Sequence, residues 1–238
     1  MALAIVSERI REEDRSALEK EGFSILPCPR QPLLPAPIAD HPDAILAILG
    51  ESLYCYEGYK NANADFFSAL TALRPNLKVI MLPDAPAGAY PRDCAYNLLC
   101  LGRQVFYNPK GISPALACAC EAEGFLAHAV HQGYAACTVR AIGEGHAITA
   151  DAGMARALEA TGIRVLKIRE GGISLPPYAH GFIGGASGCF GGKVYFYGDL
   201  HAHPDGAAME EFIRAAGFSA KSLSAEPLID LGGMLFIE

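Results

Sequence analysis

Four glycine turns, each followed by a helix and a strand, recur along the chain and strongly limit its possible folds. The expected turns lie at Gly50, Gly102, Gly143 and Gly191. Each stands between two short apolar runs, which is the pattern of a β-hairpin. A repeat of about 40 to 55 residues indicates units that bury their apolar faces only against neighbouring units.

The expected helices end in a matching way. A glycine followed by an apolar residue closes each of them, because glycine readily adopts the left-handed backbone that terminates a helix. These pairs are Gly22-Phe23, Gly124-Phe125, Gly162-Ile163 and Gly217-Phe218. The alternative fold is an open α/β sheet. The hairpins argue against it, because they require antiparallel pairs before each helix.

The two chain ends supply the parts of a fifth unit. The N-terminal segment provides a strand at residues 2–6, a helix and a second strand, whereas the C-terminal segment, residues 228–237, provides only a strand. We therefore expect the two ends to pair, which closes the units into a ring and removes open sheet edges. The sequence predicts a single α/β propeller domain over residues 1–238, built from five pseudo-symmetric hairpin-helix-strand units.

Composition limits the partners and the compartment. The chain has 238 residues, 51% of them hydrophobic, a net charge of −7 and eight cysteines. Because basic residues form no cluster and no apolar run could span a bilayer, we expect neither a nucleic-acid nor a membrane partner. No signal peptide pattern is present, and the cysteines have no regular spacing, so we expect reduced thiols in the cytoplasm. We expect no cofactor and no metal.

An Arg92-Asp93 pair leads into the second expected hairpin. A carboxylate at the entry of a buried hairpin is unfavourable unless it is paired or binds a cation. One interpretation is structural: Asp93 pairs with Arg92 or caps backbone amides. The other is functional: Asp93 orients a cationic ligand.

Residues at the hairpin entries of different units should meet near the ring axis. The catalytic candidates are Asp93, a carboxylate, and Cys137, a thiol nucleophile expected to begin a strand of the third hairpin. The substrate-binding candidates are Arg92, Asn97, Gln132, Tyr134, Ser187, Asp230 and His41, and Asp43 and Cys189 enter the same region. Structural alternatives remain: Cys137 as a buried apolar side chain, Asp230 as a backbone cap and His41 as a turn residue before proline.

Five such units closed by the termini resemble the pentein fold, the α/β propeller of the guanidino-group-modifying enzymes. That group includes arginine deiminases, agmatine deiminases, dimethylarginine hydrolases and amidinotransferases. The Arg92-Asp93 pair resembles one that opens a deiminase hairpin, in which the aspartate holds the substrate guanidinium. Segments 132–135, 181–188, 203–205 and 226–230 are similar to an uncharacterised bacterial family of this superfamily. The resemblance implies a guanidine- or amidine-modifying enzyme, either amidinohydrolase-like, which breaks a C–N bond with water, or amidinotransferase-like, that acts on a small, polar, cationic molecule.

The chain departs from the active pentein enzymes at two places. Their nucleophilic cysteine lies in the last strand, where this chain has Gly232-Gly233-Met234. Their catalytic histidine lies in the third hairpin with an acid two residues on, where this chain has Ala135-Ala136-Cys137. Two classes of function follow: an enzyme with a relocated mechanism, or a non-catalytic pentein that binds small molecules or proteins.

Overall fold

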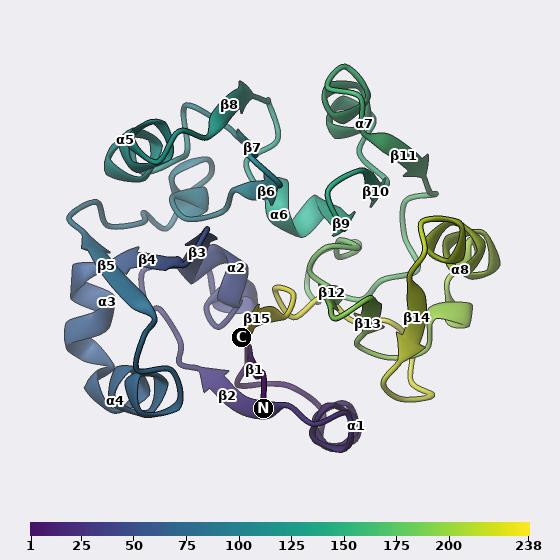
Figure 1. Cartoon of the computed structure of the whole chain (residues 1–238), viewed down its shortest axis with the longest axis horizontal. Coiled ribbons are helices and arrows are strands. Elements are labelled where there is room, and N and C mark those ends of the chain that lie inside the picture. The colour runs from purple at the N-terminus through teal and green to yellow at the C-terminus, as the bar shows by residue number, and fades with distance from the viewer.

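The structure, a computed structural model, describes residues 1–238 and contains five separate three-stranded sheets arranged in a ring (Figure 1). In each sheet the middle strand pairs antiparallel with one neighbour and parallel with the other. The first four sheets are β3 (Leu46–Leu49), β4 (Ser52–Tyr56) and β5 (Lys78–Leu82); β6 (Leu99–Leu101), β7 (Gln104–Tyr107) and β8 (Leu126–Ala129); β9 (Val139–Ile142), β10 (His146–Thr149) and β11 (Arg164–Lys167); and β12 (Ser187–Phe190), β13 (Lys193–Phe196) and β14 (Ser219–Ser222).

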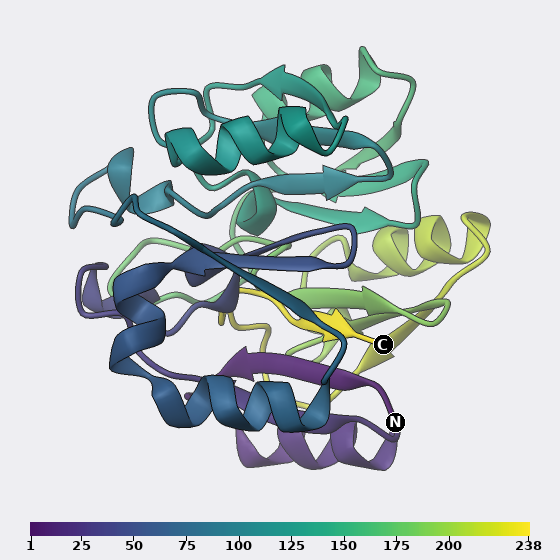
Figure 2. The same cartoon turned by 60° about the vertical axis from the view of Figure 1, so that its left-hand side comes forward.

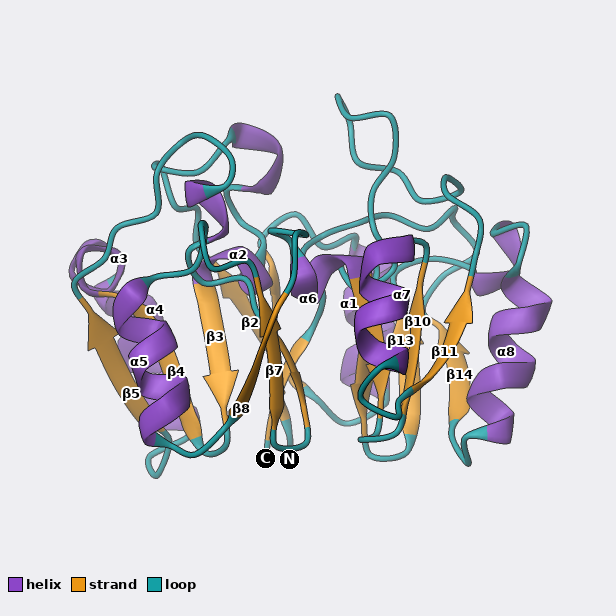
Figure 3. Cartoon of the chain, turned by 90° about the horizontal axis from the view of Figure 1, so that it is seen from above, coloured by secondary structure: helices purple, strands orange, loops and turns teal.

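The fifth sheet joins the two ends of the chain. It consists of β15 (Leu235–Ile237), β1 (Leu3–Ser7) and β2 (Ser24–Cys28), and β1 pairs antiparallel with β15. Figures 2 and 3 show the two termini side by side at one face of the ring. The expected fifth unit and its closure by the termini are therefore confirmed. The C-terminal strand is shorter than the predicted 228–237, because residues 230–234 form turns and loops before β15 begins.

Helices lie on the rim of the ring and connect the middle strand of each unit to its third strand (Figure 1). They are α1 (Glu12–Lys20), α3 (Glu57–Ala62) with α4 (Ala64–Leu73), α5 (Pro114–Ala122), α7 (Ala152–Glu159) and α8 (Gly206–Ala215). None of the helices is both long and apolar enough to cross a membrane.

The hairpin turns confirm the predicted repeat. Gly50, Gly102, Gly143 and Gly191 have φ angles of 56°, 57°, 56° and 57°. Only glycine adopts this left-handed conformation without steric cost. The four turns therefore have the same backbone geometry, and each reverses the chain between the two antiparallel strands of its hairpin. Apolar side chains then pack between neighbouring units; Leu3 and Ile5 of β1, for example, share a core cluster with Leu53 of β4 and with Phe66 and Phe67 of α4.

Three hairpins begin differently from the prediction. Short helical turns stand where strand entries were expected: α2 (Pro42–Ile45), the 3-10 turn η2 (Arg92–Cys94) and α6 (Ala135–Thr138). Cys137 therefore lies in α6 and not at the start of a strand, and Asp93 lies in a helical turn several residues before β6. A largely buried helical turn such as α2 or α6 has the same apolar pattern as a buried strand, which explains the error. Figure 3 shows α2 and α6 on the face opposite the termini.

Candidate functional site

A pocket of about 510 Å³ lies on the face that carries α2 and α6. Its lining offers acid-base, nucleophilic and hydrogen-bonding side chains: His41, Asp93, Tyr134, Cys137 and Asp230, together with the imidazole of His180 and the hydroxyls of Tyr90 and Tyr178. His41, Asp93, Cys137 and Asp230 come from four different units of the ring, so the convergence of hairpin-entry residues that the repeat predicts is present here. A second pocket of the same volume, beside β15, is lined by no histidine and no cysteine. The chemistry of the first pocket makes it the candidate site.

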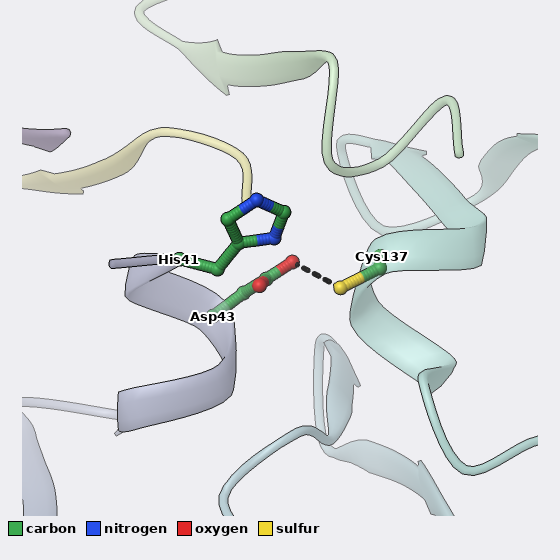
Figure 4. Close-up of side chains that lie close together, drawn as sticks. All are labelled: His41, Asp43 and Cys137. Atoms are coloured by element: carbon green, nitrogen blue, oxygen red, sulfur yellow. Dashed lines mark hydrogen bonds between the residues drawn. The ribbon is translucent and has the colours of Figure 1, made fainter. Parts of the chain in front are cut away.

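The thiol of Cys137 lies between two polar partners. Its Sγ donates to Asp43 Oδ2 over 2.8 Å, as Figure 4 shows, and accepts from Asn97 Nδ2 over 3.1 Å. Asn97 also donates to the backbone oxygen of Asp43 and accepts from the backbone nitrogen of Ala136, so it joins α2 to α6. Burial, and then the charge of Asp43, raise the pKa of Cys137 well above its usual value. The resting group is therefore a thiol beside a hydrogen-bond acceptor.

Asp43 is suited to receive the thiol proton. Burial raises the pKa of its carboxyl group to about 6, against the opposing effects of the Cys137 hydrogen bond and the Arg140 charge. Its second oxygen, Oδ1, is buried without a hydrogen-bond partner. A carboxylate that titrates near neutral pH, with one oxygen on a thiol, has the properties of a general base.

Ionised Asp43 should destabilise the fold, and Asp43→Asn should remove that cost. In the unfolded chain this carboxyl group ionises near 3.8, whereas in the fold it ionises near 6, so stability falls as pH rises from about 4 to about 6. We expect Asp43→Asn to raise the free energy of unfolding by about 1 to 3 kcal/mol at about pH 8. At about pH 3.5 the two proteins should be nearly equal in stability, because wild-type Asp43 is then mostly protonated in both states.

Urea unfolding at both pH values measures this difference. Asp65→Asn is the control, because Asp65 is an exposed carboxylate on α4. An Asp43→Asn protein that is less stable than wild type at about pH 8 would contradict the assignment of Asp43 as a strained, ionised group.

His41 and Asp230 form a second buried pair. His41 Nδ1 lies 3.7 Å from Asp230 Oδ1, and both side chains are 1% exposed. Burial lowers the pKa of His41, although the charges of Asp230 and Asp40 oppose this, so the ring is neutral at neutral pH. Its Nε2 is buried and has no partner. Burial likewise raises the pKa of Asp230.

Asp230 both caps backbone amides and lines the pocket, the two roles expected for it. Its Oδ2 accepts from the backbone nitrogen of Phe182 and its Oδ1 from that of Gly232, as a capping carboxylate would, while the side chain also lines the pocket. Two glycines leave it room. A Cβ on Gly185 would lie 1.9 Å from Asp230 Oδ1, and one on Gly232 would lie 2.3 Å from His41 Cβ. Only glycine at these positions allows the pair to form.

Asp93 is buried without a cationic partner. Its Oδ2 accepts from the Tyr134 hydroxyl over 2.6 Å, and it forms no ion pair with Arg92, which is exposed. The structural alternative of an Arg92–Asp93 salt bridge is thus absent. Within the pocket the negative charge of Asp93 is held only by neutral donors, an arrangement that favours a bound cation.

Four of the substrate-binding candidates do not line the pocket: Arg92, Asn97, Gln132 and Ser187, although Asn97 contacts the Cys137 thiol. Gln132 bridges Asp151 and the backbone nitrogen of Tyr134, Ser187 accepts from Arg140, and Arg92 faces solvent. Gln132 and Ser187 act instead as supports for neighbouring segments. The residues that sequence reasoning missed are aromatic ones on loops: Tyr90, Tyr178 and Phe182. No local signal marks them, because they follow no strand or helix periodicity.

His41, Asp43 and Cys137 also form a possible set of metal ligands (Figure 4). Each offers one ligand atom, and these atoms lie within 4.8 Å of one another. Nitrogen, oxygen and sulfur donors of this kind suit Zn²⁺. The same three residues therefore serve either thiol chemistry or metal binding, and an experiment has to separate the two.

Comparisons with known proteins support the fold. The family described as "Family of unknown function (DUF6873)" matches residues 5–235. No curated protein sequence matches the chain. Among solved structures, a cysteine-to-serine mutant of DDAH from Pseudomonas aeruginosa, complexed with citrulline, is similar with a TM-score of 0.59 and 9% identity, covering 94% of this chain and 91% of that one.

Two amidinotransferases are similar as well. One is an inosamine-phosphate amidinotransferase from Streptomyces griseus, with a TM-score of 0.53 and 14% identity over 95% of this chain and 79% of that one. The other is an amidinotransferase of saxitoxin biosynthesis from Microseira wollei, with a TM-score of 0.56 and 12% identity over 89% of this chain and 73% of that one. At these identities the likeness shows the fold, and the expected pentein architecture is confirmed.

Proposed function

Since the chain belongs to the family of unknown function DUF6873 and has the pentein fold, we propose that it is an enzyme that breaks a C–N bond of a guanidine or amidine, with Cys137 as its nucleophile. One observation carries the proposal: the hydrogen-bonded Cys137–Asp43 pair stands at a pocket whose wall holds Asp93 and Asp230 but no lysine or arginine. A guanidinium matches such carboxylates because its N–H groups form a planar fork of donors.

The bound cation activates the thiol. A positive charge next to Sγ stabilises the thiolate and so opposes the burial that holds the proton in place. The Cys137 proton then passes to Asp43 Oδ2, and Sγ attacks the central carbon of the guanidinium or amidinium. The C–N bond breaks, and the departing amine takes its electron pair together with the proton from Asp43. The carbon is left bound to sulfur as a cationic S-linked intermediate.

Release of that intermediate needs a second nucleophile. In a hydrolase this is water; in a transferase it is an acceptor amine. When water attacks the carbon and the C–S bond breaks, two protons are released: one returns to the Cys137 thiolate and the other leaves through His41 to solvent. His41 is suited to this step because it is neutral and its Nε2 has no partner.

Turnover should increase with pH as Asp43 ionises. A protonated Asp43 cannot accept the thiol proton, so kcat/KM should fall on the acid side with a midpoint at the Asp43 pKa, which burial raises to about 6. Initial rates from about pH 4.5 to about pH 8 with a guanidine substrate measure this profile. A rate that is constant across pH 6 would contradict the assignment of Asp43 as the base.

A screen of guanidines and amidines tests the function itself. Release of amine or ammonia reports turnover, and mass spectrometry of quenched reactions reports an adduct on the peptide that contains Cys137. We expect both signals, and we expect them to persist in the presence of a metal chelator. Loss of turnover on chelation would favour the His41–Asp43–Cys137 metal site instead. Ligands that raise the melting temperature without product or adduct would favour the non-catalytic binding protein.

A further inference from the structure

The pocket has two chemically different parts. Its inner part holds Cys137, Asp93 and Asp230. The rest of its wall is mostly apolar or aromatic, with Ile38, Leu175, Tyr178 and Phe182, and also contains His180. A molecule whose cationic end reaches the thiol therefore leaves its other end against apolar surface.

Aromatic rings lead from the inner part towards solvent. The Tyr134 hydroxyl holds Asp93, and the Tyr134 ring lies 6.0 Å from that of Tyr90 and 6.5 Å from that of Phe182, centroid to centroid. Tyr90 is 55% exposed and Tyr178 is 48% exposed, so large aromatic side chains remain uncovered where the pocket meets solvent. Exposed aromatic rings that line a cavity are typical of sites that bind an apolar group.

No fixed cation is available to an anionic substituent. Neither lysine nor arginine lines the pocket. The guanidinium of Arg140, which is near Asp43, is already occupied by Ser187 Oγ and by the backbone oxygens of Gly184 and Ser187. A carboxylate at the other end of the ligand would lie against the apolar wall and lose hydration without a compensating partner.

We infer that the substrate is a guanidinium or amidinium ion that carries an apolar or aromatic substituent and no carboxylate. This inference rests on the proposed function, because it assumes that the cationic end lies at Cys137. It excludes free amino acids such as arginine as good substrates.

A matched series of ligands tests the substrate class. Phenethylguanidine, n-butylguanidine, methylguanidine and L-arginine are compared by calorimetric Kd and by kcat/KM at about pH 8, above the pKa of the proposed base Asp43. Phenethylguanidine should bind at least about tenfold more tightly than L-arginine, because the carboxylate of arginine is left unpaired. The Kd of n-butylguanidine should lie between the values for phenethylguanidine and L-arginine.

Variants of the wall sharpen the test. Phe182→Ala should weaken the binding of phenethylguanidine about tenfold and leave the Kd of methylguanidine unchanged, since only phenethylguanidine reaches the aromatic wall. Tyr178→Arg should strengthen the binding of L-arginine about tenfold, because the new guanidinium supplies a partner for the ligand carboxylate. Tyr178→Phe keeps the ring and adds no charge, so it should not strengthen the binding of L-arginine.

The two proposals fail in different ways. If L-arginine is bound and turned over at least as well as phenethylguanidine, the inference about the substituent is overturned while the proposed function stands. If none of the four ligands binds or reacts, both are overturned.

Discussion

Replacing Cys137 with alanine should reduce turnover by about a thousandfold or more, because removing the nucleophile of a covalent mechanism leaves only the binding contributions. Ligand affinity should remain close to that of wild type, since in the proposed site Asp93 and Asp230 hold the cation and the sulfur does not. Turnover by product release and Kd by calorimetry measure the two effects separately.

The design needs variants that preserve the surroundings of the thiol. Cys137→Ala leaves Asp43 Oδ2 without its 2.8 Å donor, whereas Cys137→Ser keeps a donor at that position while providing a poor nucleophile. Both should be inactive, and the serine variant should have a melting temperature closer to wild type. Cys118→Ala on α5 is the control for loss of an exposed thiol. Retention of most of the activity in Cys137→Ser would rule out covalent catalysis by Cys137.

Replacing Asp93 with asparagine should weaken guanidinium binding by about 10- to 100-fold, the usual contribution of a hydrogen bond to a charged group. The shape of the side chain is kept and only its charge is lost. Stability should not fall, because an uncompensated buried charge is removed and the Tyr134 hydroxyl still has an oxygen to donate to. Kd for methylguanidine and the melting temperature of the free protein measure these outcomes.

Two controls separate ligand binding from a structural role. Arg92→Ala changes the exposed neighbour and should affect neither quantity. Tyr134→Phe removes the hydroxyl that holds Asp93 and should weaken binding less than Asp93→Asn does. If Asp93→Asn is markedly less stable than wild type and neither protein responds to any guanidine, Asp93 is a structural carboxylate and the proposed site is wrong.

Local backbone chemistry explains why the architecture was predictable from sequence. Glycine is required at the four hairpin turns, because each has φ of 56° or 57°, and such positions are visible as glycine in the printed sequence. The pairing of the two chain ends was predictable as well. Each end supplies only part of a unit, and an unpaired strand there would leave an exposed edge that the other end can cover. The pairing of β1 with β15 is thus a consequence of sequence order.

The candidate site was predictable only in part. Residues that precede hairpin strands were expected to meet, and His41, Asp93, Cys137 and Asp230 all line one pocket. The short helical turns at α2 and α6 were not expected, and they decide that Cys137 faces Asp43 over 2.8 Å. Gln132 and Ser187 also stand near hairpin entries, yet they do not line the pocket. The Gln132 side chain donates to Asp151, and Ser187 accepts from Arg140.

By itself the sequence determined the repeated unit, the ring and its closure, because turn chemistry, helix ends and apolar periodicity act over a few residues and leave a local record. Only the tertiary structure decided the site. The raised pKa values of Asp43 and Cys137 arise from burial by segments more than 90 residues apart, and the aromatic wall of Tyr90, Tyr178 and Phe182 comes from loops. Burial and loop packing depend on how whole units lie against one another, and no short stretch of sequence records that arrangement.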